Sequence, residues 1–259
     1  NESGEVIWKI DTALTVFDLW HLSDDRILFC HYGKNGSGAR IIDRSGKTLF
    51  QYTTEHEVFT CQPLENGGVL VGELRQKRIV ETDDKGNIVK TIPFDYKGDE
   101  PHETMRMARK LENGTYMIVS PGSKKIVFLD ETGKTLKEFD TRPDTFGAVI
   151  RSDGNVVYSC MEGLFELDEK GNEVWSLTNE DVPEINICWL LGIQLRKNGN
   201  IVCTNWLGHG HNGEGVPVFE GTPDKKVVWQ CDCRDRLPNL GNFCLLGEND
   251  EEVAKIPLR

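Results

Sequence analysis

The segment at residues 205–215 gathers the side chains of this sequence that are best suited to binding chemistry. It contains Asn205, Trp206, His209, His211 and Glu214, together with four glycines. Glycine lets a backbone approach a ligand closely, and irregular loops on a rigid scaffold are common binding sites. The segment therefore predicts a ligand-binding loop. The alternative is a solvated loop whose histidines form only local hydrogen bonds.

The spacing of His209 and His211 could present two imidazoles to a divalent metal ion. A structural zinc site uses four protein ligands and a catalytic site usually three, and the residues that could complete a set here are His56, His102 and Glu214. No sequence spacing relates those three to the pair. We therefore predict no resident cofactor, and a divalent metal at His209 and His211 stays a hypothesis whose full ligand set is unknown.

Two other histidines, His56 and His102, occur in matching contexts, each followed by a glutamate and then by a predicted innermost strand. Histidine titrates near neutral pH and can shuttle protons, while Arg106 could bind an anionic group through two hydrogen bonds. If the chain is an enzyme, we expect His56, His102, Arg106 and His209 to be catalytic. The alternative is that both His-Glu pairs are repeat-derived positions whose histidines bond neighbouring backbone.

The overall composition excludes several classes of protein. The chain has 259 residues, 42 acidic and 30 basic, with a formal net charge of −12. Phosphate binding needs a basic surface, so the acidic balance argues against a nucleic-acid partner. No apolar run approaches the ~20 residues of a membrane span. The eight cysteines are expected to be mainly free thiols, because a domain of this length does not need disulfides to be stable.

The elements that must position these side chains are repeated. Turn signals rich in Asn-Gly and Asp-Gly recur at intervals of ~40–45 residues, and a second set of glycine turns recurs between them. Short runs rich in Val, Ile, Phe and Leu separate the turns, four to each unit. In two successive units the predicted strands are Val58–Leu64, Gly68–Leu74, Arg78–Asp83, Asn87–Phe94, Met105–Leu111, Thr115–Ser120, Lys125–Asp130 and Thr135–Phe139. Four strands per ~40–45 residues is the period of a β-propeller blade.

Counting the outermost strands predicts an all-β fold, a six-bladed β-propeller with four-stranded blades in a single domain, 1–259. The six predicted outermost strands are Val6–Ile10, Thr48–Tyr52, Asn87–Ile92, Thr135–Phe139, Glu173–Leu177 and Lys226–Gln230. The last innermost strand is Gly241–Gly247, so the last blade should be closed by the N-terminal strand, with a middle strand from Glu252–Arg259. That blade is the one most expected to be incomplete.

In such a fold, the loops that precede the innermost strands share a face with the loops that join second and third strands. Every histidine except His21 is therefore expected near the mouth of a central channel. The residues expected to bind a ligand there are Asn205, Trp206, His211, Glu214, Trp189 and Asn242.

The blade consensus, as in Leu111–Met117, Leu129–Lys134 and Phe219–Trp229, resembles the quinoprotein-like (PQQ-like) and arylsulfotransferase-like propellers. It is most similar to uncharacterised exported bacterial propellers of the surface-layer type. The resemblance implies an extracytoplasmic location, periplasmic or cell-surface. A first residue other than Met fits a processed exported chain and a trimmed cytoplasmic one equally, so this expectation rests on the resemblance.

Arylsulfotransferases use channel histidines, one of which accepts the sulfuryl group, with nearby Arg and Asn as anion stabilisers. The positions that look similar here are His102 with Arg106, and His209 near Asn205. Quinone enzymes usually have eight blades and a calcium site, so a six-bladed chain argues against that cofactor.

Three functions remain open from the sequence, one of them a purely structural surface module. The first is a secreted or cell-surface propeller, a monomer that binds a small-molecule, glycan or protein ligand at the His/Asn/Trp-rich mouth. The second is a transferase or lyase that acts on an anionic substrate in the same mouth. A fold by itself does not decide between binding and chemistry.

Overall fold

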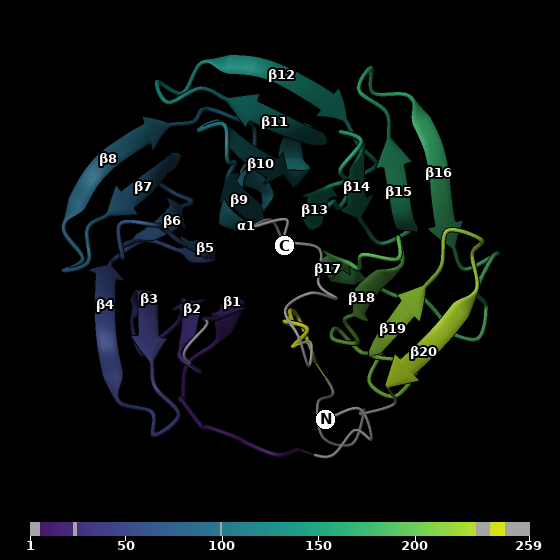
Figure 1. Ribbon diagram of the computed structural model, residues 1–259, viewed down its shortest axis with the longest axis horizontal. Helices are drawn as coiled ribbons and strands as arrows, with labels where there is room; N and C mark the ends of the chain where they lie inside the picture. Colours follow the sequence, from purple (N-terminus) through teal and green to yellow (C-terminus); the bar gives the residue numbers. More distant parts are fainter. Residues whose placement is uncertain (1–5, 23–24, 99, 232–238, 247–259) are drawn as a thin grey trace. The chain divides into compact units, whose positions relative to one another are not determined.

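The structure is a computed structural model that describes residues 6–22, 25–98, 100–231 and 239–246. The chain divides into two compact units, which we call the three-blade unit (Thr12–Thr145) and the two-blade unit (Asn1–Asp11 with Phe146–Arg259). Both units consist of four-stranded antiparallel sheets, or blades, whose strands follow one another in sequence order (Figure 1). The fold is thus an all-β propeller.

The described residues of the three-blade unit form twelve strands and two short helices. Its first blade is β1 (Val16–His21), β2 (Ile27–His31), β3 (Ser37–Ile42) and β4 (Thr48–Thr54). The second is β5 (Val58–Pro63), β6 (Val69–Glu73), β7 (Arg78–Thr82) and β8 (Ile88–Pro93). The third is β9 (Met107–Lys110), β10 (Tyr116–Ser120), β11 (Lys125–Leu129) and β12 (Thr135–Asp140). Helix α1 (Pro101–Thr104) precedes β9, and the 3-10 helix η1 (Pro121–Ser123) follows β10.

In the two-blade unit, the part of the chain that the structure describes forms eight strands. Its first blade is β13 (Gly147–Ile150), β14 (Val156–Ser159), β15 (Gly163–Leu167) and β16 (Glu173–Thr178). The second is β17 (Leu190–Leu195), β18 (Ile201–Asn205), β19 (Val218–Gly221) and β20 (Val227–Cys231). Across the described part of the chain, no helix has the length and apolar character that crossing a membrane requires.

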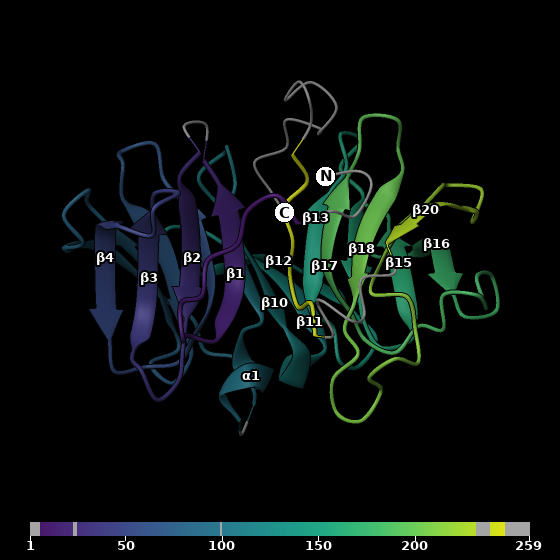
Figure 2. The ribbon, with the colours of Figure 1, turned by 90° about the horizontal axis from the view of Figure 1, so that it is seen from below.

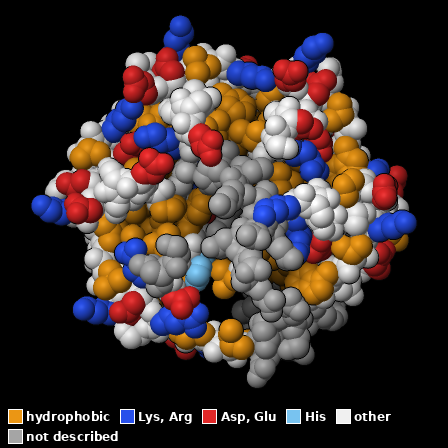
Figure 3. All heavy atoms as spheres, in the orientation of Figure 1, with side chains coloured by type: hydrophobic (Ala, Val, Ile, Leu, Met, Phe, Trp, Pro, Cys, Tyr) orange, Lys and Arg blue, Asp and Glu red, His pale blue; other side chains and the backbone are white. Residues whose placement is uncertain are grey.

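Burial falls from the middle of each blade to its outer edge. Strands β6, β10, β15 and β18 are buried at every position, whereas β12 is exposed at all but one. Side chains of the middle strands pack on both sheet faces, while an outermost strand faces solvent. Acidic and basic side chains are interspersed over the face shown in Figure 3. Some form ion pairs between blades, as Lys90 of β8 does with Glu131 in the turn between β11 and β12 (2.8 Å).

The hairpin between the third and fourth strands is built in the same way in four blades. An aspartate ends the third strand and accepts backbone N–H groups two and four residues later, as Asp130 does from Thr132 (2.8 Å) and Lys134 (3.0 Å). The glycine three residues on has a positive φ, for example 86° at Gly133. The aspartates are Asp43, Asp83, Asp130 and Asp168. The fifth hairpin has no glycine there, and Lys225 takes up the left-handed conformation (φ 61°) instead.

The prediction of six blades is wrong, because the described residues form five. The predicted closure of a last blade by the N-terminal strand is also wrong, since residues 6–10 belong to no strand. Residues 241–246 of the predicted strand Gly241–Gly247 likewise form none. Gly247 and the tail Glu252–Arg259 lie outside the described residues.

Side-chain hydrogen bonds, rather than a strand ladder, hold residues 241–246 against the second blade of the two-blade unit. The amide of Leu245 donates to the side-chain oxygen of Gln194 (3.0 Å), and the hydroxyl of Thr204 donates to the carbonyl of Gly241 (3.3 Å). A sheet needs consecutive backbone groups to pair. The segment therefore lies along β17 and β18 without starting a blade.

Candidate functional site

In the three-blade unit, polar and aromatic side chains gather at the end of the blades where β1 begins and β2 ends. Helix α1 lies beyond this end of the strands (Figure 2). The residues there include His31, His56, His102 and Arg106, as the strand order predicts. His31 is buried and its Nδ1 lies 3.2 Å from the carbonyl of Gly36, while burial lowers the pKa of its imidazole. His56 is half-buried and His102 is exposed.

Glu57, the glutamate that follows His56 in the repeated His-Glu pair, is the centre of a polar cluster. Its side chain is buried, and Oε1 accepts hydrogen bonds from Nε of Arg75 (2.6 Å) and from the hydroxyl of Tyr32 (3.2 Å). Its Oε2 is buried and has no hydrogen-bond partner in the described residues. Burial acts to raise the pKa of Glu57, but the hydrogen bonds and the charge of Arg75 outweigh it, so the pKa lies below its ordinary value.

This depressed pKa makes the stability of the three-blade unit depend on pH. The ionised Glu57 contributes stability above its unfolded-state value of 4.5, and the contribution is lost as the pH falls through the lower folded-state value. We expect the unit's melting temperature to fall below pH 4.5, and Glu57→Gln to remove roughly 2–5 °C of that fall. Thermal unfolding followed by circular dichroism between pH 7 and pH 3 measures it. An unchanged profile in Glu57→Gln, or an equal change in the exposed control Glu112→Gln, would contradict the assignment.

Aromatic rings lie beside this cluster. Phe17 and Phe59 stack with their centroids 4.3 Å apart, and the guanidinium of Arg106 lies 5.2 Å from the centroid of Phe59. Burial lowers the pKa of Arg106 to about 10, which still leaves it charged at neutral pH. An arginine held on an aromatic face can present its planar donors to an anion. This arrangement agrees with the anion-binding role predicted for Arg106, a role that stays a prediction.

An open groove of about 590 Å³ lies in the same unit near α1. Three lysines and two acidic residues lie among its lining residues, so its charge is mixed: Lys77, Lys97, Lys124, Glu103 and Asp144. Lys77 is paired with Asp95 (2.9 Å). The mixed charge gives the groove no clear preference for an anion.

The two-blade unit holds a second cluster, which we call the aromatic cluster: Trp189, Trp206 and His209. The Trp189 and Trp206 centroids are 6.1 Å apart at 84°, and His209 lies 4.8 Å from Trp206 at 86°. Both indoles are half-buried and His209 is exposed. Edge-to-face packing of this kind fixes the rings relative to one another. The indole N–H of Trp189 is buried and has no acceptor among the described residues.

The side chain of Asn205, which was expected to bind a ligand, holds the backbone beside the aromatic cluster through its own hydrogen bonds. It is fully buried, and its Oδ1 accepts the backbone N–H groups of Cys188 (2.8 Å) and Trp189 (3.2 Å). Its Nδ2 donates to the carbonyl of Asn186 (3.1 Å). The side chain therefore clamps the chain that enters β17 to the end of β18. Glycine is needed at 208, because a Cβ there would lie 2.1 Å from the indole of Trp206.

His211 and Glu214 lie on the same loop, and their side chains meet Cys188. His211 Nδ1 is 2.7 Å from Oε2 of Glu214. The ligating atoms of Cys188, His211 and Glu214 all lie within 4.8 Å of one another. Sequence reasoning identified the histidine and the glutamate but not the cysteine, which stands 23 residues before His211. No spacing rule links them.

The remaining expected residues are distributed as follows. Asn242 lies against β17, where a Cβ at Gly192 would approach its Oδ1 to 2.6 Å. Of the four residues expected in an enzyme, His56, His102 and Arg106 belong to the three-blade unit and His209 to the two-blade unit. Neither unit alone contains all four.

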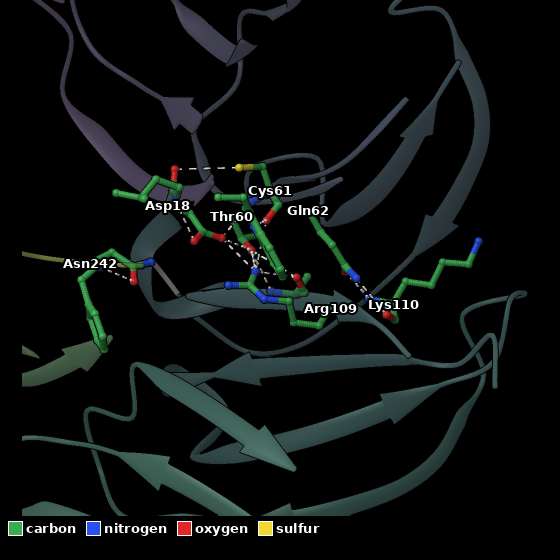
Figure 4. Close-up of polar contacts among 11 residues, drawn as sticks. Asp18, Thr60, Cys61, Gln62, Arg109, Lys110 and Asn242 are labelled. Atoms are coloured by element: carbon green, nitrogen blue, oxygen red, sulfur yellow. Dashed lines mark hydrogen bonds and ion pairs between the residues drawn. The ribbon is translucent and has the colours of Figure 1, made fainter. Parts of the chain in front are cut away.

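A buried ion pair joins the innermost strands of the three-blade unit, and the sequence did not reveal it. Figure 4 shows the guanidinium of Arg109 between the carboxylate of Asp18 and the hydroxyl of Thr60. Arg109 Nη1 lies 2.8 Å from Asp18 Oδ2 and 2.8 Å from Thr60 Oγ1. The backbone N–H of Cys61 also donates to Asp18 Oδ2 (3.1 Å). Both charged side chains are almost fully buried, so this network supports the fold and is closed to a ligand.

No protein-family model matches the chain. A search of curated proteins likewise gives no significant match. Solved structures share its fold. A Bacteroides caccae protein of unknown function aligns with a TM-score of 0.80 and 20% identity, over 92% of this chain and 89% of that one.

Two other similar structures carry names of enzymes. A catalytically inactive virginiamycin B lyase from Staphylococcus aureus, solved with quinupristin, aligns with a TM-score of 0.58 and 14% identity, over 85% of this chain and 70% of that one. A gluconolactonase-like protein aligns with a TM-score of 0.62 and 12% identity, over 91% and 82%. At these identities the likeness concerns the fold alone.

Proposed function

We propose that this protein is a ligand-binding β-propeller whose two-blade unit takes a small molecule or a glycan against the aromatic cluster. The observation that carries the proposal is the edge-to-face arrangement of Trp189, Trp206 and His209 at the end of β18, with rings that are half-buried or exposed. Half-exposed aromatic rings offer large apolar area at low conformational cost, and a polar rim can add orientation.

The buried groups around the cluster support a pre-formed site. Asn205 holds both Cys188 and Trp189 by their backbone N–H groups, so the indole enters the cluster from a fixed backbone. The indole N–H of Trp189 has no acceptor among the described residues, and a hydrogen-bond acceptor on a bound ligand could satisfy it. Pre-organisation of this kind lowers the entropy lost on binding.

The ligand class follows from the chemistry of the cluster. Indole rings stack on the C–H faces of sugars and on aromatic rings, and His211 and Glu214 supply hydrogen-bonding groups on the same loop. We therefore favour a glycan or an aromatic small molecule over a highly charged ligand. An extracytoplasmic location and a monomeric state stay predictions that accompany this proposal.

The test is a binding screen with the intact chain. Intrinsic tryptophan fluorescence and calorimetry would be followed against neutral oligosaccharides, acidic oligosaccharides and aryl sulfates. We expect saturable binding to one class, weakened about 30-fold or more in Trp206→Ala, because a central aromatic contact contributes about 2 kcal/mol or more. Trp229→Phe is the matched control, since Trp229 is an indole of the same unit on the outermost strand β20. Equal affinity in Trp206→Ala, or no saturable binding in the panel, would count against the proposal.

A transferase or lyase acting on an anionic substrate is the second candidate, supported by the guanidinium of Arg106 over the stacked Phe59 and Phe17. In this case His56, His102 and Arg106 supply the base and the anion-binding group in the three-blade unit, and His209 is the fourth residue expected to be catalytic. Turnover of sulfate esters or acidic sugars that is abolished in His102→Ala would favour this function. Identical turnover by the variant would defeat the catalytic assignment of His102.

A further inference from the structure

Three side chains with metal-binding atoms converge in the two-blade unit from two separate segments. Cys188 comes from the chain that enters β17, while His211 and Glu214 come from the loop between β18 and β19. One ligand atom of each lies within 4.8 Å of the other two. Cys188 and His211 are half-buried and Glu214 is exposed, so the group is open to solvent on one side.

Hydrogen bonds from two asparagine side chains and one loop turn hold the two segments together. The side chain of Asn186 donates to the carbonyl of Glu214 (2.6 Å), which ties the loop to the segment of Cys188. The N–H of Glu214 donates to the carbonyl of His211 (3.0 Å), so one turn places the imidazole and the carboxylate on the same side. Asn205 fixes the backbone of Cys188 from below by accepting its N–H (2.8 Å). The three groups are therefore juxtaposed by the fold.

We propose that Cys188, His211 and Glu214 bind one divalent transition-metal ion, most suitably Zn²⁺, with a fourth position left for water or a ligand. A thiolate with an imidazole and a carboxylate suits Zn²⁺ or Co²⁺, whereas Ca²⁺ and Mg²⁺ require oxygen ligands. Three protein ligands with an open position is the pattern of a zinc site that exchanges ligands, not of a closed structural site.

Binding requires a small rearrangement and the loss of one proton. Ligand atoms around one zinc ion lie roughly 3.5 Å apart, whereas these atoms lie within 4.8 Å of one another and His211 Nδ1 is 2.7 Å from Glu214 Oε2. The loop that must adjust contains Gly210 and Gly213, both with positive φ and with open space around them. The Cys188 thiol, which now donates to the carbonyl of Asn186 (3.5 Å), releases its proton to solvent, and His211 binds as a neutral imidazole.

The proposed metal site adjoins the aromatic cluster, because His211 and Glu214 lie on the same loop between β18 and β19 as His209. This inference goes beyond the proposed ligand site. It shares His211 and Glu214 with the rim of that site, but it holds without it, because Trp189, Trp206 and His209 supply none of the three ligands.

The test uses the full chain, reduced and stripped of metal with a chelator. Titration with Co²⁺ should give one equivalent bound per chain, with a thiolate-to-Co²⁺ charge-transfer band that Zn²⁺ abolishes. Cys188→Ser should remove the band and weaken Zn²⁺ binding by about 100-fold or more. Cys244→Ser is the matched control, since Cys244 is another half-buried free thiol of the same unit, and it should leave the band unchanged.

A second variant tests metal binding in a chain that is expected to stay folded. Glu214 is exposed, so Glu214→Gln should keep the circular dichroism and melting temperature of the wild type while lowering the Zn²⁺ affinity at least ten-fold. Co²⁺ binding without the thiolate band, or equal Zn²⁺ affinity in Glu214→Gln and the wild type, would overturn the proposal. Trp206→Ala should retain full Co²⁺ binding, which separates this site from the proposed ligand site.

Discussion

Replacing Arg109 by Met is expected to lower the free energy of unfolding of the three-blade unit by about 3–5 kcal/mol. The guanidinium is 2% exposed and the Asp18 side chain 4%. Loss of the arginine leaves a buried carboxylate without its 2.8 Å partner. Such an uncompensated charge costs more than the ion pair itself contributes, because both groups have already been removed from water.

The network around Arg109 increases the effect. Its Nη1 also donates to Thr60 Oγ1 (2.8 Å) and to the carbonyl of Ala108 (3.0 Å), and its guanidinium lies 5.1 Å from the ring of Trp20. One side chain thereby joins β1, β5 and β9, the innermost strands of all three blades of this unit. Its removal should loosen the packing between blades rather than one strand alone.

Urea unfolding of the single variants Arg109→Met and Asp18→Leu and of the double variant measures the coupling. The double variant should be more stable than the sum of the single effects predicts, because it leaves no unpaired charge. Lys90→Met, at the surface pair with Glu131, is the control and should change stability by less than about 1 kcal/mol. Additive effects in the cycle would show that the two charges do not stabilise each other.

The second large effect is expected at Asn205. Asn205→Leu should destabilise the two-blade unit by about 2–5 kcal/mol, because the backbone N–H groups of Cys188 and Trp189 lose their acceptor, each at a cost of about 1–3 kcal/mol. The same change releases the segment that carries both side chains. We therefore expect loss of ligand binding at the aromatic cluster and loss of the Co²⁺ band together.

Asn205→Asp separates the contribution of the side-chain acceptor of Asn205 from that of its side-chain donor. It keeps the acceptor for Cys188 and Trp189 but removes the donor to the carbonyl of Asn186. We expect Asn205→Asp to be less destabilising than Asn205→Leu in urea unfolding. If Asn205→Leu bound the metal and the ligand as the wild type does, the positioning role of Asn205 would be excluded.

The strands and their turns follow closely from local sequence. The prediction of Arg78–Asp83 corresponds to β7 (Arg78–Thr82), and Lys125–Asp130 to β11 (Lys125–Leu129). Four of the described hairpins between third and fourth strands combine an aspartate with a glycine three residues later, and neighbouring backbone N–H groups bond to the aspartate. Because these interactions span only a few residues, the sequence pattern predicts them reliably.

The predicted number of blades was wrong because of the two ends of the chain, where the strand pattern is weakest. Val6–Ile10 has the composition of an outermost strand, as Lys226–Gln230 does, but only the latter lies beside a third strand that can pair with it, β19. A strand is stable only with a hydrogen-bonded neighbour. Composition cannot show whether that neighbour exists, so counting strands from composition gave one blade too many.

Local chemistry along the chain was enough to define the β-strands, their four-strand period and the hairpins that join them. The contacts among Cys188, His211 and Glu214 and the pairing of Arg109 with Asp18 arise only in the folded chain, since the partners are separated by 23 and 91 residues. Side chains at such separations meet only because several strands pack together in the folded chain. The type of a residue therefore does not show which distant residue it will contact.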